Sequence, residues 1–295
     1  MQRFLDPTVL AGISSLDLVA KTVVDGFVAG LHRSPDFGFS QEFAEYRAYA
    51  PGDDLRHVDW NLYARTERCY LKRYRGETNS QLAVLLDASN SMLYSSGELK
   101  KMDYARFVAA SLLYLTIHNQ RDAAGLIVFD DEIREYVRPS TRQGQLARLF
   151  AALEQAEPRA RTDFSKPLEY FQRLLQRRGI LIVISDFFED PETIVRGIEP
   201  LRFHGNDVVL FHILDRQEVQ PVLKSPAVLV DLETDQKIEV VPDYVRTTYR
   251  AKMEAHIEQL RLRSRAAGMD YQLLVTDQPL DAALHEYLSL RQAGH

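Results

Sequence analysis

The sequence contains little cysteine and no long apolar run. Its 295 residues include one cysteine, Cys69, which excludes an internal disulfide and a zinc site built from several thiolates. The strongest apolar run, residues 180–184, is far shorter than the roughly 20 residues that a membrane-spanning helix needs. The N-terminal sequence MQRFLDPTVL carries Asp6 within its apolar stretch, so no secretory signal is predicted. We therefore expect no membrane span, and a cytoplasmic location by default.

Strong charge of one sign is also lacking. There are 36 Lys and Arg residues against 42 Asp and Glu residues, a net charge of −6, so nothing in the composition calls for nucleic acid or an anionic membrane. A Walker glycine–lysine loop is absent too, so we do not expect the chain itself to hydrolyse nucleotides. The hydrophobic fraction of 45% is ample for a folded core, which excludes disorder as the main state.

The N-terminal part and the rest of the chain differ in pattern. Apolar residues recur at helical spacing over residues 14–28 and predict an amphipathic helix. Residues 32–71 show little periodicity and are dense in arginine, aspartate and aromatic residues, with a turn signal at Pro51-Gly52-Asp53-Asp54. We therefore treat residues 1–77 as one region, a helix followed by an irregular segment, and residues 78–295 as a domain.

Within residues 78–295, short β-rich runs alternate with helical patterns. The expected strands are 81–87, 124–130, 180–186, 207–215 and 271–277, and the expected helices are 102–118, 143–155, 167–177, 192–203 and 244–267. This alternation predicts an α/β fold with a mostly parallel, Rossmann-like sheet and helices on both faces. Two strand-like runs about a polar turn predict a β-hairpin insert at about 225–242.

The sharpest group of polar residues is Asp87-Ala88-Ser89-Asn90-Ser91, directly after the first apolar strand. Ligands of open α/β sheets bind beyond the carboxyl ends of the strands, and alternate side chains point to one side, so Asp87, Ser89 and Ser91 are expected to converge. One carboxylate and two hydroxyls suit Mg²⁺ or Mn²⁺ but are too weakly charged to hold the ion alone. The alternative is that Ser89 or Ser91 caps the following helix.

Two further residues extend this group into a known pattern. Thr162 lies in a polar loop between two helical patterns, and Asp186 closes the strand ILIVIS. Asp130, Asp215 and Asp277 also end strand-like runs, but only Asp186 follows Thr162 by a single helix.

With these residues, the chain resembles the von Willebrand factor A domain. The metal-ion-dependent adhesion site of that domain uses Asp-x-Ser-x-Ser, a later Thr, and an Asp after a central strand. The resemblance implies a site for Mg²⁺ or Mn²⁺ at Asp87, Ser89, Ser91, Thr162 and Asp186. It also implies a non-enzymatic binding module, in which a carboxylate of a partner protein completes the coordination of the ion.

A second resemblance lies in the irregular segment, which reads Glu42-Phe43, Tyr46-Arg47, Tyr49, Pro51-Gly52-Asp53-Asp54, Arg56, Asp59-Trp60 and Ala64-Arg65. It is similar to the signature of a bacterial family of unknown function that places this segment before a von Willebrand A-type domain. Genes of that family commonly neighbour those of MoxR-type AAA+ ATPases, so the resemblance implies such an ATPase, or its client protein, as the partner. Physically, the aspartates and arginines could form a charge-assisted network that folds a loop, as scaffolding or as a partner surface.

Two other functions remain open from the sequence. A metal-dependent hydrolase or phosphotransferase could use the same pocket, but it needs an acid–base group beside the ion, and the sequence points to none. A phosphoryl-transferring site of the haloacid dehalogenase type is disfavoured, because it needs a second carboxylate at the position of Ser89. A catalytic serine at position 89 is also disfavoured, because a serine nucleophile needs a base and a glycine-flanked turn, and Ser89 has neither beside it. His57 and Asp59 could form a metal or acid–base site, but a structural, hydrogen-bonded role is expected for this histidine. The third possibility is a structural subunit without metal.

Overall fold

A computed structural model describes residues 6–31, 43–49, 58, 60–66, 68–74, 81–159, 170–171, 174, 178–230, 232 and 236–293. The chain divides into two compact units, one formed by Met1–Phe27 with Ser80–His295 and the other by Val28–Asn79. The first 27 residues, which we predicted to belong with the N-terminal region, therefore cluster with the α/β part of the chain.

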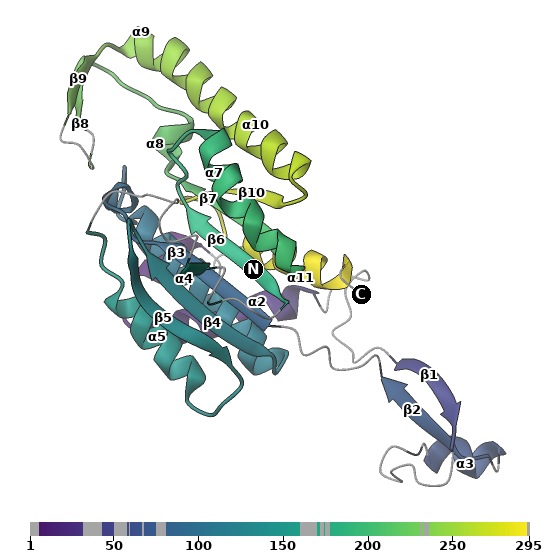
Figure 1. Ribbon diagram of the computed structural model, residues 1–295. Coiled ribbons are helices and arrows are strands. Elements are labelled where there is room, and N and C mark those ends of the chain that lie inside the picture. Colours follow the sequence, from purple (N-terminus) through teal and green to yellow (C-terminus); the bar gives the residue numbers. More distant parts are fainter. Residues whose placement is uncertain are drawn as a thin grey trace. The chain divides into compact units, whose positions relative to one another are not determined.

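The larger unit is built on one six-stranded sheet with the order β10-β7-β6-β3-β4-β5 (Figure 1). Its strands are β3 (Gln81–Asp87), β4 (Ala123–Phe129), β5 (Ile133–Ser140), β6 (Ile180–Ser185), β7 (Asp207–Leu214) and β10 (Asp270–Val275). All neighbouring strands pair in parallel except β4 and β5, which are antiparallel. The predicted, mostly parallel sheet is confirmed, and each of the five predicted strands is present.

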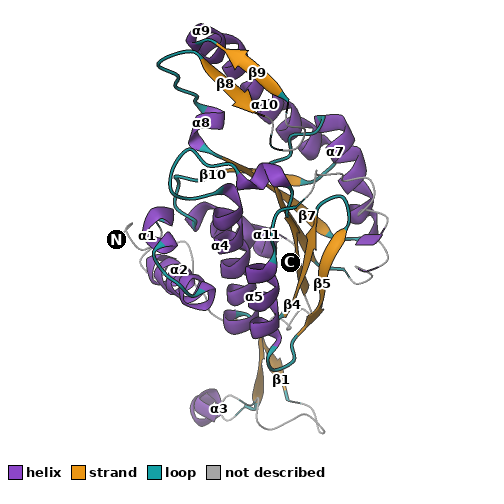
Figure 2. Cartoon of the chain, turned by 90° about the vertical axis from the view of Figure 1, so that its left-hand side faces the viewer, coloured by secondary structure: helices purple, strands orange, loops and turns teal. Residues whose placement is uncertain are grey.

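Helices cover both faces of this sheet (Figure 2). They are α4 (Lys101–Tyr114), α5 (Gln145–Gln155) and α11 (Asp281–Ala293) on one side, and α7 (Pro191–Ile198) and α10 (Arg250–Ala266) on the other. Alternate strand residues point to one face, so Leu85 of β3 and Val183 of β6 pack in the same core cluster as Ile194 of α7 and Leu260 of α10. The sequence analysis predicted neither β5 nor α11.

Further helices and strands complete the larger unit. They are α1 (Pro7–Ala11), most of α2 (Leu16–Leu31), η3 (Asn90–Leu93), η4 (Leu115–Asn119), η5 (Glu199–His204), α8 (Arg216–Val219), β8 (Ala227–Val230), β9 (Lys237–Val240), α9 (Pro242–Tyr244) and η6 (Val245–Tyr249). The predicted N-terminal helix is present as α2. Strands β8 and β9 form an antiparallel pair, which confirms the predicted hairpin.

The smaller unit corrects one expectation. Strands β1 (Phe43–Ala48) and β2 (Tyr70–Tyr74) pair antiparallel, and α3 (Trp60–Thr66) lies between them in the chain. The prediction that residues 32–71 lack regular structure was therefore wrong for these residues, and residues 44–48 of β1 do alternate between apolar and polar side chains, which is a short strand signal. Most residues of the predicted charge network lie outside the described residues, namely 53, 54, 56 and 59. Residue 57, the histidine that we expect to be structural, also lies outside them.

The order of the strands places a topological switch point between β3 and β6. From β3 the chain moves outward on one side to β4 and β5, then returns to β6, which pairs with the other side of β3. In open α/β sheets, ligands bind beyond the carboxyl ends of the strands at such a point. These ends carry Asp87 on β3 and Asp186 after β6.

Gly179 allows β6 to begin directly beside β3. A methyl group added at Gly179 would clash with the backbone oxygen of Gln81, the first residue of β3. Because this neighbour is backbone, Gly179→Ala is expected to destabilise the protein by about 1–3 kcal/mol, as overpacking does. Gly97→Ala is the matched control, since nothing lies within 4 Å of its added carbon. Equal urea midpoints for the two variants would contradict the prediction.

In the part of the chain that the structure describes, no helix has both the length and the apolar character needed to cross a bilayer.

Candidate metal and protein-binding site

Asp87 is fully buried at the carboxyl end of β3 and organises the loop that follows. Its Oδ1 accepts a hydrogen bond from the backbone N–H of Ser89 at 2.8 Å, and its Oδ2 accepts one from the hydroxyl of Ser185 at 2.5 Å. Ser185 is the last residue of β6, so this carboxylate ties together the two strands at the switch point. Asp87 thus fixes the backbone on which both serines stand.

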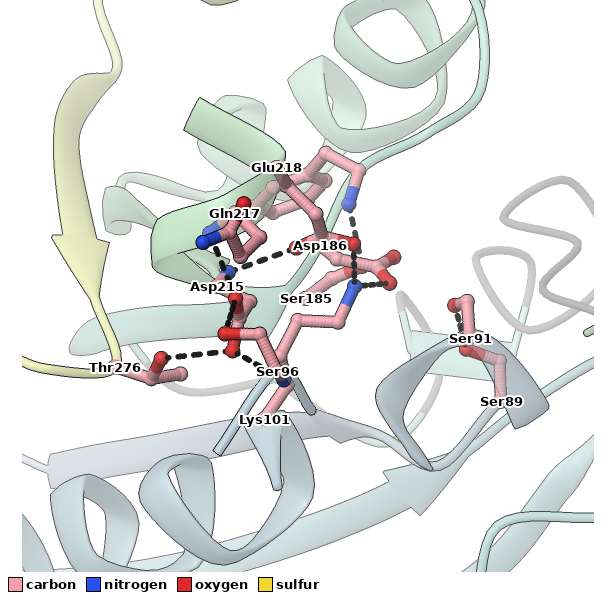
Figure 3. Close-up of polar contacts among 11 residues, drawn as sticks. Ser89, Ser91, Ser96, Lys101, Ser185, Asp186, Asp215, Gln217, Glu218 and Thr276 are labelled. Atoms are coloured by element: carbon pink, nitrogen blue, oxygen red, sulfur yellow. Dashed lines mark hydrogen bonds and ion pairs between the residues drawn. The ribbon is translucent and has the colours of Figure 1, made fainter. Parts of the chain in front are cut away.

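The two serines converge as the spacing predicts. The hydroxyl oxygens of Ser89 and Ser91 are 2.9 Å apart, and Figure 3 shows them turned toward each other. Ser89 is the N-cap residue of η3, but its side chain makes no capping hydrogen bond. The capping alternative therefore does not account for Ser89, whose hydroxyl contacts the other serine of the group.

Asp186 lies next to Asp87 across the switch point, in the loop after β6. Its side chain is almost completely buried, and it lies close enough for its charge to act on Asp87. The next residue, Phe187, has a φ of +46°, which is costly for a bulky L-residue. The ring nitrogen Nε2 of His256 on α10 donates to the Phe187 carbonyl at 2.8 Å and helps to hold this turn.

The three other aspartates that end strand-like runs, Asp130, Asp215 and Asp277, make contacts of their own. Asp130 accepts hydrogen bonds from the side chain of Arg134 at 2.6 Å and from the backbone of Glu132 at 3.0 Å. Asp215 caps α8, and half-exposed Asp277 lies 3.7 Å from Arg216. Thr162 lies outside the described residues, so four of the five predicted ligands can be placed.

Sequence reasoning missed a buried lysine beside these residues. The ammonium of Lys101, at the start of α4, lies 2.7 Å from Oδ2 of Asp186 and 2.9 Å from Oε1 of Glu218 on α8. Figure 3 shows this ammonium among carboxylates, with the serine pair to one side. The sequence carries no signal for it, since Lys100 and Lys101 are adjacent and identical, yet only Lys101 is buried.

A second set of contacts extends the network to the neighbouring strand ends. Oδ1 of Asp215 accepts from the hydroxyl of Ser96 at 2.5 Å, and Oδ2 accepts from the Ser96 backbone at 3.0 Å and from Thr276 at 3.4 Å. Oε2 of Glu218 accepts from the backbone N–H of Asp215 at 2.7 Å, which completes a capping box. Side chains that follow β3, β6, β7 and β10 are therefore joined by hydrogen bonds and ion pairs.

Burial disfavours the charged forms of the carboxyl groups in this region. Burial, and then the charge of Asp186, raise the pKa of Asp87 to about 7. Burial also raises the pKa of Glu218, whereas the pKa of Lys101 is raised because Asp186 and Glu218 outweigh its own burial. Burial lowers the pKa of nearby His212 to about 3, so this imidazole is neutral at pH 7.

These observations bear on whether a divalent cation fits. The described residues of the network include four buried carboxyl groups, those of Asp87, Asp186, Asp215 and Glu218, and the ammonium of Lys101 pairs with two of them, Asp186 and Glu218. No cluster of three His, Cys, Asp or Glu residues in the described ranges has the geometry of a metal site. A cation here would therefore depend on the hydroxyls of Ser89 and Ser91 as well as on carboxylates, a donor set of oxygens alone that suits Mg²⁺ or Mn²⁺.

The structure is that of an α/β chain with a mostly parallel sheet and polar side chains gathered at its switch point, and sequence comparison identifies its family. The chain matches the family described as "Protein of unknown function DUF58" over residues 45–259, and it belongs to that family. An uncharacterised protein of Mycobacterium tuberculosis is 26% identical over 294 residues, which cover 98% of this chain and 92% of the relative.

Solved structures of similar fold have low sequence identity. The conserved hypothetical protein BatB from Bacteroides thetaiotaomicron gives a TM-score of 0.47 at 15% identity, over 72% of this chain and 98% of that one. The SpRpn10 VWA domain gives a TM-score of 0.43 at 12% identity, over 70% of this chain and 94% of that one.

Proposed function

We propose that this protein is a non-enzymatic, metal-dependent protein-binding module. The observation that carries the proposal is the convergence of Asp87, the Ser89–Ser91 hydroxyl pair and Asp186 at the switch point of the sheet. The raised pKa of Asp87 supports it, because a divalent cation would favour the charged form of this carboxyl group, which burial and Asp186 disfavour.

The roles of the residues follow from their chemistry. Ser89 and Ser91 would supply neutral oxygen ligands, together with Thr162 from its loop. Asp87 and Asp186 would hold the ion directly or through water. Mg²⁺ prefers near-octahedral coordination and keeps several waters, so few protein carboxylates leave it electrophilic and with an exchangeable position. A carboxylate of the partner protein would take that position, and the ion would then bridge the two proteins.

The β8–β9 hairpin is the second region that we expect the partner to contact. It follows α8 in the chain and extends away from the sheet in Figure 1. Several of its large apolar side chains are exposed, with 57% exposure for Val228 and 61% for Ile238. An isolated two-stranded hairpin is marginally stable, and grouped apolar exposure of this kind marks interaction surfaces.

The partner that we propose is a MoxR-type AAA+ ATPase, or a client protein that it handles. This choice rests on the signature segment and its resemblance, and it places the protein as an adaptor in protein maturation or complex assembly. The buried lysine does not favour a hydrolase in the same pocket, because an ammonium paired with two carboxylates has no free electron pair to act as a general base.

A pull-down with a MoxR-type ATPase tests the proposal. Binding is expected in Mg²⁺, and we expect it to be lost in chelator and strongly reduced by Ser89→Ala combined with Ser91→Ala, since these changes remove two ligands of the bridging ion. Ser95→Ala is the control, because its hydroxyl contacts only the backbone of Gly97 and Leu99 in the same loop. Full retention of the ATPase by the double variant would show that the ion does not bridge the proteins.

A further inference from the structure

Lys101 lies where it can compete with a cation for Asp186. The ammonium is completely buried and lies 2.7 Å from Oδ2 of Asp186, closer than the 2.9 Å to Oε1 of Glu218. A cation that engages Asp186 therefore meets a carboxylate that already carries a positive partner. Two like charges near one carboxylate repel each other strongly where water is excluded.

Glu218 offers Lys101 an alternative partner. Its Oε1 is 2.9 Å from the ammonium, while its Oε2 is held by the backbone N–H of Asp215 in the capping box of α8. Because the capping box fixes Glu218, the carboxylate stays in place if Asp186 turns away. Lys101 can then keep its ion pair with Glu218 while Asp186 binds the cation.

The aromatic rings around Lys101 also stabilise its charge. The ammonium lies 4.6 Å from the centre of the Phe188 ring and 5.7 Å from that of the Tyr94 ring, within the range of cation–π attraction. Phe188 is in the same loop as Asp186, and Tyr94 follows η3 with its serine loop. Thus Lys101 contacts residues on both sides of the candidate site without being a candidate ligand itself.

We propose that Lys101 sets the metal affinity of this site by competing with the cation for Asp186, with Glu218 as the residue that retains the ammonium when the cation binds. The inference rests on the proposed function for the position of the metal. Lys101 and Glu218 are positioning residues, because each acts on the ion through Asp186.

The inference predicts opposite effects for two substitutions. Lys101→Met removes the competing charge and retains an unbranched side chain, so Mn²⁺ binding is expected to tighten by roughly tenfold or more. Glu218→Gln removes the alternative partner and one negative charge, so Lys101 stays on Asp186 and Mn²⁺ binding is expected to weaken several-fold. The Mn²⁺ affinity of the double variant is expected to lie between the affinities of the two single variants.

Calorimetric titration of the full chain with Mn²⁺ measures these affinities. The matched controls are Lys100→Met, which changes the exposed neighbour of Lys101, and Glu254→Gln on the exposed side of α10. Both controls are expected to bind Mn²⁺ as the unchanged protein does. A merely structural role for the pair predicts that both site substitutions weaken binding, and that result would overturn the inference.

Other outcomes separate this inference from the proposed function. If the unchanged protein binds Mn²⁺ and Lys101→Met binds it no more tightly, the inference fails and the metal-dependent function stands. If only Lys101→Met binds Mn²⁺, the inference holds and the metal bridge of the unchanged protein fails. If neither the unchanged protein nor Lys101→Met binds Mn²⁺, both the inference and the proposed metal-dependent function are overturned. If Lys101→Met does not fold, the Glu218→Gln variant tests the inference by itself. Unchanged or tighter binding of Mn²⁺ by Glu218→Gln would overturn the inference.

Discussion

Lys101→Met will lower the thermal midpoint of the metal-free protein more than any single surface substitution. Removing one member of a buried ion pair costs roughly 3–5 kcal/mol, because the remaining carboxylates lose their counter-charge. Each kcal/mol shifts the midpoint of a domain of this size by roughly 2–4 °C, so a fall of roughly 6–20 °C is expected. Differential scanning calorimetry in chelator measures it.

Lys100→Met is the matched control for this prediction. The two lysines are adjacent, but Lys100 is exposed, so its replacement is expected to change the stability by less than about 0.5 kcal/mol. Saturating Mn²⁺ is expected to restore much of the midpoint lost in Lys101→Met, because the ion supplies the missing positive charge. Equal midpoints for both lysine variants in chelator would show that the Asp186 and Glu218 contacts contribute little to stability.

Chelation of the unchanged protein is expected to produce the second large effect. With Mg²⁺ at roughly a hundred times its dissociation constant, the native state gains about 2.7 kcal/mol. At roughly 2–4 °C per kcal/mol, chelator should lower the midpoint by roughly 5–11 °C. Asp87→Ala should abolish this difference, because it removes a candidate ligand and the carboxylate that orders the serine loop.

Asp130→Ala is the control for the chelation experiment. Asp130 is also a fully buried aspartate directly after a strand, but it contacts Arg134 and the backbone of Glu132. The substitution is expected to destabilise the protein while leaving the difference between Mg²⁺ and chelator intact. A midpoint of the unchanged protein that does not respond to chelation would favour the structural subunit without metal.

Much of the fold could be predicted because its elements are marked by local patterns. Buried parallel strands such as β3 and β6 are continuous apolar runs, and the helices carry an apolar stripe with a period near 3.6 residues. The edge strand β5 was missed because its burial is intermittent and it contains charged residues and a proline. The β1–β2 pair was missed because the alternation in β1 spans only five residues, 44–48, and the sequence YLKRY of β2 does not alternate.

The sequence by itself determined five of the six strands of the central sheet, the two strands of the hairpin and the convergence of Asp87, Ser89 and Ser91, since each of these depends on residues within one strand or loop. Only the tertiary structure decided that Lys101 rather than Lys100 is buried, and that Asp186 and Glu218 surround it. These partners lie 85 and 117 positions from Lys101 along the chain. The physical reason is that local periodicity reports which face of an element is apolar, whereas the pairing of buried charges depends on which strand ends the sheet brings together.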